Sequence, residues 1–326
     1  MRSLKLAYPG LRLSLIGLAS ARELALRFLD YFDGFIEVPP LAGLHPSPAD
    51  EAEVGAALQA VREQHFDVIV QMHGSGPRSN EITARMGGRL IAGFYPAGAT
   101  PPEGGAFFPY PQRGSEVERN LALALALGGA NAGIELEFPV TEADRIELRG
   151  VLLNEGVEPG LYVCVHPGAK LASRRWPAER FAAVADELAR RGYRVLITGS
   201  SGEAALTASV RSAMRRQAVD LAGRTSLGAL AALIEGSQLL VSNDTGVAHI
   251  AAALKTPSVI VANGSDVERW SSADEELHPT LAQDIDCRPC VHDVCPIGQP
   301  CALAITPAML LERAEPLLSM SKGRPT

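Results

Sequence analysis

The chain has 326 residues, of which 47% are hydrophobic, and this length allows two domains that each bury a core. Its formal net charge of −7 argues against nucleic acid as the main partner, because that role requires a basic face. No apolar run approaches the roughly 20 residues of a membrane helix, and the N-terminus carries no signal-peptide pattern. We therefore expect a cytoplasmic α/β protein without a transmembrane segment.

The first half alternates between strand and helix patterns. Helix propensity favours a helix over 116–127, although Leu and Ala alternate there as they would in a strand. The other expected helices are 21–32, 50–64 and 79–86, and the expected strands are 11–16, 35–38, 68–72 and 90–94. A proline and a charged stretch then separate the two halves, so we predict domains 1–145 and 146–326.

The second half alternates more clearly and predicts a mostly parallel sheet. Its expected strands are 161–166, 194–198, 219–222, 239–242 and 258–262. Its expected helices are 177–191, 203–216, 226–235 and 245–254. Small or polar residues follow all five strands. Because ligands of open parallel sheets bind at the carboxyl ends of the strands, we expect a ligand cleft there.

The junction at 239–254 is the most informative segment. Asp244 is predicted to be the N-cap of the following helix, with Thr245 and Gly246 in the first turn. Unpaired N–H groups of a first turn favour an anion, and a small residue at Gly246 lets a diphosphate approach the backbone. His249 follows Thr245 by four residues and can face the same side. The alternative is that Asp244 only caps the helix and that His249 only packs.

A cluster of four cysteines follows the last predicted strand. Its spacing, C-x2-C-x4-C-x5-C, could bind zinc or an iron–sulfur cluster, but the last two spacings do not match a paired zinc knuckle. We favour reduced thiols and expect no cofactor. Asp284 and Asp286 in the same loop are interpreted as surface carboxylates. The candidate metal ligands, on the alternative interpretation, are Cys287, Cys290, Cys295 and Cys301.

Several short motifs of the second half occur in the order typical of one family. They are HPGA at 166–169, RRWP at 174–177, GSSGE at 199–203, LAGRTSL at 221–227 and NDTGVAH at 243–249. In these motifs and in its cysteine loop the chain resembles glycosyltransferase family 9, the ADP-heptose:lipopolysaccharide heptosyltransferase family. The Asp-Thr-Gly-x-x-His element is the most specific. The first half resembles the family more loosely, through FDVIVQMHG at 66–74.

The resemblance implies a GT-B fold, in which two Rossmann-like domains face each other across a cleft and bind acceptor and donor respectively. It implies inverting, metal-independent transfer of a sugar, with heptose as one option, from a nucleoside-diphosphate sugar to a glycan or lipid-linked cell-envelope acceptor. ADP is the nucleotide that it favours, and it leaves open peripheral attachment to the inner membrane face.

The family's donor-binding roles carry over to matching positions of this sequence. Arg174 would neutralise phosphate charge, and Glu203 would accept hydrogen bonds from the ribose. The start of the last predicted helix, together with a protonated His249, would stabilise the departing diphosphate. The donor-binding residues implied in this way are Arg174, Glu203, Asp244, Thr245, Gly246 and His249.

The resemblance is incomplete at the N-terminus. Family members begin with a strand and a Gly-Asp loop that carries the expected general base, whereas this sequence opens at the end of the helix that follows, in residues 1–9. We therefore expect an incomplete N-terminal domain whose sheet exposes pairing edges, and the general base is unassigned. The competing explanations are a start codon placed too far downstream, which we favour, an inactive truncated product, or a different base.

Two residues of the first half are candidates for a site. His73 follows a predicted strand and, because histidine titrates near neutrality, is the candidate for a different base. Arg78 is the candidate for binding an anionic acceptor. The alternative function is a catalytically inactive relative that binds a nucleotide or nucleotide sugar. A nucleotide-sugar epimerase fits the order of the motifs less well.

Overall fold

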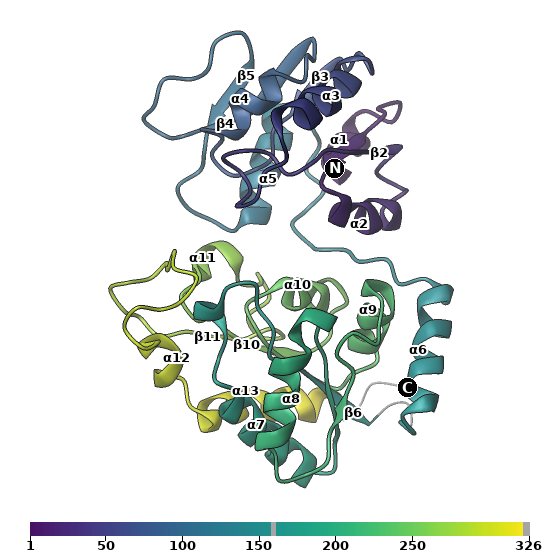
Figure 1. Cartoon of the computed structure of the whole chain (residues 1–326), viewed down its shortest axis with the longest axis vertical. Helices are drawn as coiled ribbons and strands as arrows, with labels where there is room; N and C mark the ends of the chain where they lie inside the picture. Colours follow the sequence, from purple (N-terminus) through teal and green to yellow (C-terminus); the bar gives the residue numbers. More distant parts are fainter. Residues whose placement is uncertain (158–160, 322–326) are drawn as a thin grey trace. The chain divides into compact units, whose positions relative to one another are not determined.

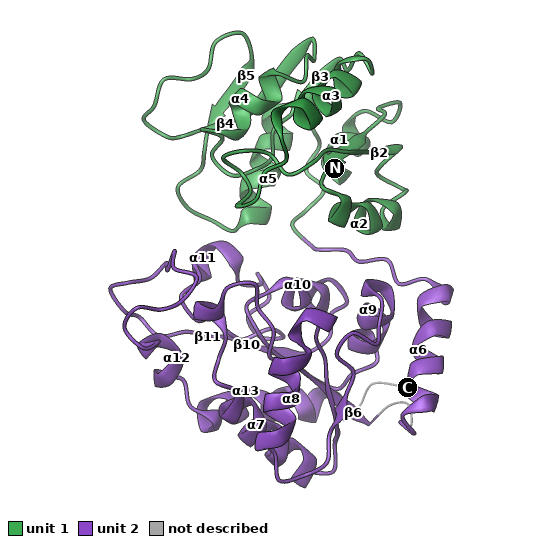
Figure 2. Ribbon diagram, in the orientation of Figure 1, with its two compact units in different colours: residues 1–134 green, residues 135–326 purple. Residues whose placement is uncertain are grey.

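The computed structural model describes residues 1–157 and 161–321 and divides into two compact α/β units, Met1–Ile134 and Glu135–Thr326 (Figure 2). This division falls before the boundary expected at 145/146, because the charged stretch forms helix α6 (Glu142–Asn154), which packs against α9 of the second unit. A capping box between Thr141 and Asp144 starts α6. Residues 322–326 of the predicted second domain lie outside the described residues.

The second unit contains a parallel sheet in which the described residues form six strands, in the order β11-β10-β9-β6-β7-β8. The strands are β6 (Tyr162–His166), β7 (Arg194–Ile197), β8 (Val219–Asp220), β9 (Leu240–Asn243), β10 (Ser258–Val261) and β11 (Thr280–Leu281). The first five confirm the predicted strands. β11 was not predicted.

Helices cover both faces of this sheet (Figure 1). The four predicted helices are confirmed as α7 (Ala178–Arg190), α8 (Ala204–Ala213), α9 (Leu227–Glu235) and α10 (Gly246–Ala253). The structure adds α11 (Val267–Trp270), α12 (Pro300–Ala304) and α13 (Pro307–Ser321). Side chains of α7, α8 and α13 pack in one core, and those of α6, α9 and α10 pack in another.

The strands between these two cores are buried on both faces. At the start of β9, Val241 and the preceding Leu239 belong to the core of α7 and α13, whereas Leu240 belongs to the core of α9 and α10. This double burial explains why the strands read as continuous apolar runs rather than as alternating ones. No helix of the described residues is both long and apolar enough to span a bilayer.

The first unit contains two separate parallel sheets. In its described residues, β1 (Ser14–Gly17) pairs with β2 (Gly34–Glu37), and β4 (Leu90–Tyr95) lies between β3 (Val68–Val70) and β5 (Ala106–Pro109). β5 was not predicted. The helices are α1 (Arg2–Ala7), α2 (Arg22–Arg27), α3 (Glu51–Arg62), α4 (Ser79–Ala84) and α5 (Glu116–Ala126), so the helix expected over 21–32 ends early.

One layer of helices packs against both of these sheets. Leu58 of α3 and Ile82 of α4 share a core with Ile69 of β3, and Ile16 of β1 and Ile36 of β2 pack against the same core. The two sheets are therefore joined through a common helical layer, although they do not pair with each other in the described residues.

Candidate functional site

In the sheet of the second unit, the order in which strands are added reverses beside β6. Starting from β6, strands β7 and β8 extend the sheet in succession toward one edge. β9 then pairs with the other side of β6, and β10 and β11 extend the sheet toward the opposite edge. Such a reversal separates the loops that follow the two central strands, and ligands of open parallel sheets bind in the resulting crevice. His166 ends β6 and pairs in register with Ser242 of β9. The predicted motifs that begin at His166 and Asn243 therefore both lie at this crevice.

Asn243 ties the surrounding loops together. Its Oδ1 accepts a hydrogen bond from the backbone N–H of Trp176 at 2.9 Å, and its Nδ2 donates to the carbonyl of Pro167 at 2.7 Å. From the end of β10, Asn263 donates to the carbonyl of Arg174 at 3.3 Å. Asn243 is completely buried. The loops after β6, β9 and β10 are thus fixed by side-chain amides, a role that the sequence analysis did not assign.

The prediction that Asp244 caps the helix is wrong. Helix α10 begins at Gly246, its N-cap is Thr245, and no side chain caps it in the structure described. Asp244 instead donates its backbone N–H to the carbonyl of Val261 at 3.0 Å, so it continues the pairing of β9 with β10. The N–H groups of the first turn of α10 therefore have no side-chain competitor for an anion.

Gly246 lies at an open position on this helix start. A Cβ atom built on Gly246 would meet no heavy atom within 4 Å, and the residue is exposed. The fold therefore does not need a glycine here for packing. What the missing side chain provides is free access to the backbone, as a bulky anionic ligand requires.

His249 lies one turn further along α10. Burial lowers the pKa of His249, and the nearby carboxylate of Asp244 opposes this effect without reversing it. The imidazole is therefore neutral at neutral pH in the free protein, in contrast to the protonated form considered from the sequence. Its ring lies 6.2 Å from that of Trp270 in α11, with Arg269 stacked 4.7 Å above the indole. Sequence reasoning missed Trp270, because nothing in its local sequence relates it to α10.

Glu203 lies at the end of the loop after β7. Its Oε2 accepts hydrogen bonds from the backbone N–H and hydroxyl of Ser200, at 2.8 and 2.9 Å. Although burial opposes ionisation, these bonds and the charge of Arg175 lower the pKa of Glu203. Its other oxygen packs so closely on Gly168 that a Cβ there would clash with it. Glu203 is therefore an ionised carboxylate beside the loop after β6, and Oε2 is already engaged.

Three buried polar atoms beside this crevice have no hydrogen-bond partner among the described residues. They are Nε of Arg174, Oδ1 of Asn263 and Oγ of Ser265, from the loops after β6 and β10. Buried polar atoms are nearly always hydrogen-bonded in folded proteins, so such a group of exceptions calls for an explanation. Two of the three, in Asn263 and Ser265, were not predicted as site residues.

The cysteine loop lies against the same loops. Ser173 donates its hydroxyl to the carbonyl of His292 at 2.6 Å, and the backbone N–H of Cys290 donates to the carbonyl of Gly264 at 2.6 Å. All five cysteines lie in the described residues and are free thiols. No three His, Cys, Asp or Glu side chains of these residues are grouped as a metal site. Asp284 and Asp286 are exposed, which confirms them as surface carboxylates.

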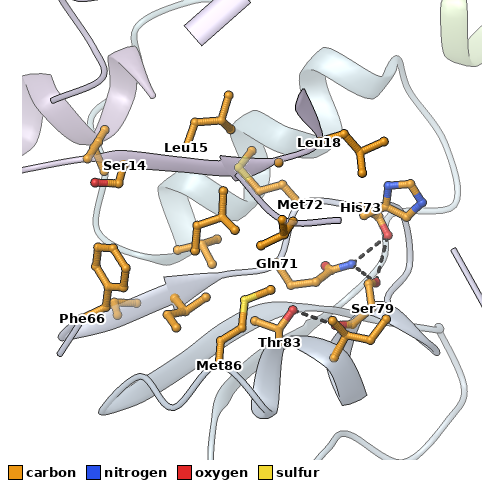
Figure 3. Close-up of a pocket in the computed structure, with 18 of the residues that line it drawn as sticks. Ser14, Leu15, Leu18, Phe66, Gln71, Met72, His73, Ser79, Thr83 and Met86 are labelled. Carbon is orange, nitrogen blue, oxygen red and sulfur yellow. Dashed lines mark hydrogen bonds between the residues drawn. The ribbon is translucent and has the colours of Figure 1, made fainter. Parts of the chain in front are cut away.

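The remaining candidates belong to the first unit. His73 is exposed just beyond β3, and its backbone carbonyl accepts a hydrogen bond from the side chain of Gln71 at 2.7 Å (Figure 3). Arg78 is exposed and forms an ion pair with Glu81 at 3.0 Å. By contrast, the predicted donor residues all belong to segments that follow strands of one sheet. Arg174, Glu203 and Asp244 follow β6, β7 and β9, and Thr245, Gly246 and His249 lie at the N-cap and in the first turns of α10.

Comparison with known proteins identifies the family. The model of glycosyltransferase family 9 (heptosyltransferase) matches residues 54–300. The chain belongs to glycosyltransferase family 9. A curated family 9 relative, lipopolysaccharide heptosyltransferase 3 of Escherichia coli (strain K12), is 30% identical over 181 residues, which are 55% of this chain and 52% of the relative. The chain thus spans about half the length of the first curated relatives that it matches.

Solved family 9 structures share the fold. A glycosyltransferase family 9 protein of Veillonella parvula superposes with a TM-score of 0.78 at 18% identity, covering 98% of this chain and 91% of that chain. An E. coli heptosyltransferase solved with ADP-2-deoxy-2-fluoro heptose superposes with a TM-score of 0.62 at 17% identity, covering 96% and 92%. These likenesses confirm the predicted fold class, a GT-B-like α/β fold with parallel sheets.

Proposed function

We propose that this chain is a glycosyltransferase that moves a sugar, with heptose as the first choice, from an ADP-sugar to a lipopolysaccharide-type glycan acceptor. The observation that carries the proposal is the uncapped start of α10 at the reversal of the parallel sheet. Gly246 leaves open space beside its backbone N–H groups, and His249 follows within the first turns. This arrangement suits a diphosphate.

The chemistry of the transfer matches these groups. An acceptor hydroxyl attacks the anomeric carbon from the face opposite the diphosphate, a base takes the hydroxyl proton, and the bond from the anomeric carbon to the diphosphate oxygen breaks. Negative charge grows on the departing ADP, where the N–H groups of α10 and the guanidinium of Arg174 would stabilise it. This displacement inverts the anomeric centre and assigns no role to a metal.

The choice of donor and acceptor rests on relatives. The E. coli heptosyltransferase of similar fold was solved with an analogue of ADP-heptose, and the E. coli relative in sequence is named for lipopolysaccharide. ADP-heptose and a heptose-deficient lipopolysaccharide are therefore the first donor and acceptor to test. We place the protein at the cytoplasmic face of the inner membrane, where such an acceptor would be reached.

A second candidate function is binding of a nucleotide sugar without transfer. It is favoured by the cavity beside β1 and β3, whose lining includes His73 but no Asp or Glu among the described residues. A transferase needs a group that removes the proton of the acceptor hydroxyl, and His73 is the candidate that we propose for it. Replacement of His73 by Gln then separates the two functions.

The experiment measures binding and transfer separately. Isothermal titration with ADP tests the donor site in the wild type, in His249→Ala and in the control Glu179→Gln, an exposed position on α7. Mass spectrometry after incubation with ADP-heptose and heptose-deficient lipopolysaccharide detects transfer. Binding with transfer that is lost in His73→Gln supports the first function, and binding without transfer supports the second. Absence of ADP binding to the wild type contradicts both.

A further inference from the structure

The imidazole of His249 is positioned without hydrogen bonds. Within the described residues neither of its ring nitrogens has a hydrogen-bond partner, although a functional histidine is usually oriented through one of them. Its ring contact is with the indole of Trp270, at 6.2 Å between ring centres and an interplanar angle of 55°. Both rings are half-buried. The direction of the imidazole therefore depends on packing, and Trp270 supplies an aromatic part of that packing.

Helix α10 directs His249 toward its own start. Side chains of an α-helix lean toward its N-terminus, so His249, the fourth residue of α10, covers the first turn. Burial lowers the pKa of His249, and the carboxylate of Asp244, just before that turn, acts in the opposite sense, which places these two side chains near each other. The imidazole thus lies beside the N–H groups that we assign to the donor diphosphate.

Trp270 is itself held by the short helix α11. The side chain of Asp266 caps this helix by accepting the backbone N–H of Arg269 at 3.2 Å, and the N–H of Trp270 donates to the carbonyl of Asp266 at 3.0 Å. The guanidinium of Arg269 stacks on the indole at 4.7 Å, a cation–π contact. Because β10, which precedes α11, pairs with β9, which precedes α10, the two helices start from neighbouring strands. The indole is therefore a fixed surface beside the imidazole.

We propose that Trp270 is a positioning residue, which holds the His249 imidazole over the first turn of α10 so that it can bind the diphosphate of the donor. This inference rests on the proposed function and names a residue that keeps its donor site in shape. An aromatic ring suits the role, because it restricts the imidazole by packing and leaves each ring nitrogen to a phosphate oxygen. A side chain that accepted or donated a hydrogen bond would occupy one nitrogen.

The first test needs no ligand. NMR follows the titration of the His249 ring in the free protein, with His249→Ala to assign its signal. Trp270→Leu removes the indole and exposes the imidazole, so the pKa of His249 should rise toward 6.5 and the ring-current shift of its protons should disappear. Trp270→Phe keeps an aromatic ring and should restore most of both effects. Identical titrations of the wild type and Trp270→Leu would overturn the proposal.

A double-mutant cycle with ADP separates positioning from direct contact. Trp270→Leu should weaken ADP binding at least about fivefold in the wild type but less than about twofold in His249→Ala, because the indole acts through the imidazole. Equal losses in both backgrounds would show that Trp270 contacts the ligand or only supports the fold, and would overturn the proposal. The control Leu303→Ala, at a side chain that is 51% exposed on α12, should leave the affinity unchanged.

The pH dependence of ADP binding gives a further signature. Wild-type affinity should increase from about pH 8 to about pH 6, and the raised pKa of His249 in Trp270→Leu should make that increase smaller. Absence of ADP binding to the wild type would contradict the proposed function and this inference together. A wild type that binds ADP, with an affinity and pH profile that Trp270→Leu leaves unchanged, would contradict the positioning role alone.

Discussion

The side-chain oxygen of Asn243 accepts a hydrogen bond from the backbone N–H of Trp176, a residue 67 positions earlier in the chain. This bond joins the end of β9 to the turn that begins α7. Through Nδ2, the same side chain also holds the carbonyl of Pro167, at 2.7 Å, after β6. One buried amide therefore joins the loops after β6 and β9 at the reversal of the sheet.

Replacement of Asn243 by Ala should destabilise the protein by about 3 kcal/mol, because it leaves a buried donor and a buried acceptor unpaired. Urea unfolding measures the free energy. Ser242→Ala is the matched control, because the Ser242 hydroxyl donates only to the neighbouring carbonyl of Asn243, and its cost should be about 1 kcal/mol. Equal costs for the two variants would show that the bridging role of Asn243 contributes little.

Replacement of Gly246 by Val should separate binding from stability. Open space surrounds this position, so the free energy of unfolding should change by no more than about 0.5 kcal/mol. The added side chain would stand where the diphosphate approaches α10, and ADP affinity should fall at least about tenfold. Calorimetry and urea unfolding of the same sample check both parts. Unchanged affinity would remove the start of α10 from the proposed donor site.

The affinity for ADP should depend on pH through His249. Burial lowers the pKa of His249 in the free protein, and a bound diphosphate would raise it, so binding takes up a proton. Affinity should therefore increase as the pH falls from about 8 to about 6. His249→Ala measured over the same range corrects for titration of ADP itself. Identical pH profiles for wild type and variant would place His249 away from the diphosphate.

His166 should make the second unit sensitive to acid. Burial lowers the pKa of His166 from 6.5 to about 4, so the folded state keeps the ring neutral while the unfolded chain takes up a proton. Stability is therefore unaffected by this group above about pH 6.5 and is lost as the pH falls toward 4, by up to about 3 kcal/mol.

Denaturant unfolding as a function of pH tests this expectation. His166→Asn keeps a polar group near the hydroxyl of Thr198, which lies 3.0 Å from Nδ1 of His166, and it cannot titrate. The variant should lack this part of the acid destabilisation even if it is less stable at neutral pH. Parallel curves for the two proteins would contradict the assignment to His166.

Gly264 should control access to the cysteine loop. Its φ of +70° disfavours other residues, and a Cβ there would lie 2.7 Å from that of Cys290. Gly264→Ala should therefore displace the loop, accelerate alkylation of Cys290, and cost about 1–2 kcal/mol of stability. Mass-spectrometric mapping of the labelled thiols measures the rate. Gly150→Ala in α6, where a Cβ meets nothing within 4 Å, should leave labelling unchanged.

The sequence predicts the second unit well because its strands are covered on both faces. Tyr162 and Cys164 face one core while Val163 and Val165 face the other, which produces apolar runs that stand out from the helices. Weaker signals were missed. β11 lies outside the regular alternation of strands and helices, and α13 contains Pro316, which by local pattern alone predicts the end of a helix.

The site was predicted in its location but not in its detailed hydrogen bonding. The sequence order of strand and polar loop places Asp244 and His249 at the sheet edge, because the carboxyl ends of parallel strands share one edge. The capping role of Asp244 was wrong because its N–H pairs with Val261, in a neighbouring strand. The roles of Asn243 and Trp270 likewise depend on contacts between segments that are separated in the sequence, which local residue patterns do not encode.

Helix α13 has a consequence for synthesis of the chain. Leu310, Ala314, Leu317 and Leu318 pack in the same core as Val163 and Val241. While a ribosome makes this protein, that face of the β6–β9 sheet stays incompletely covered, by α7 and α8 alone, until α13 emerges, whereas every strand and helix of the first unit has by then been made. The nascent second unit would accordingly depend on chaperone protection for longest, and a stop codon before residue 307 would leave it aggregation-prone.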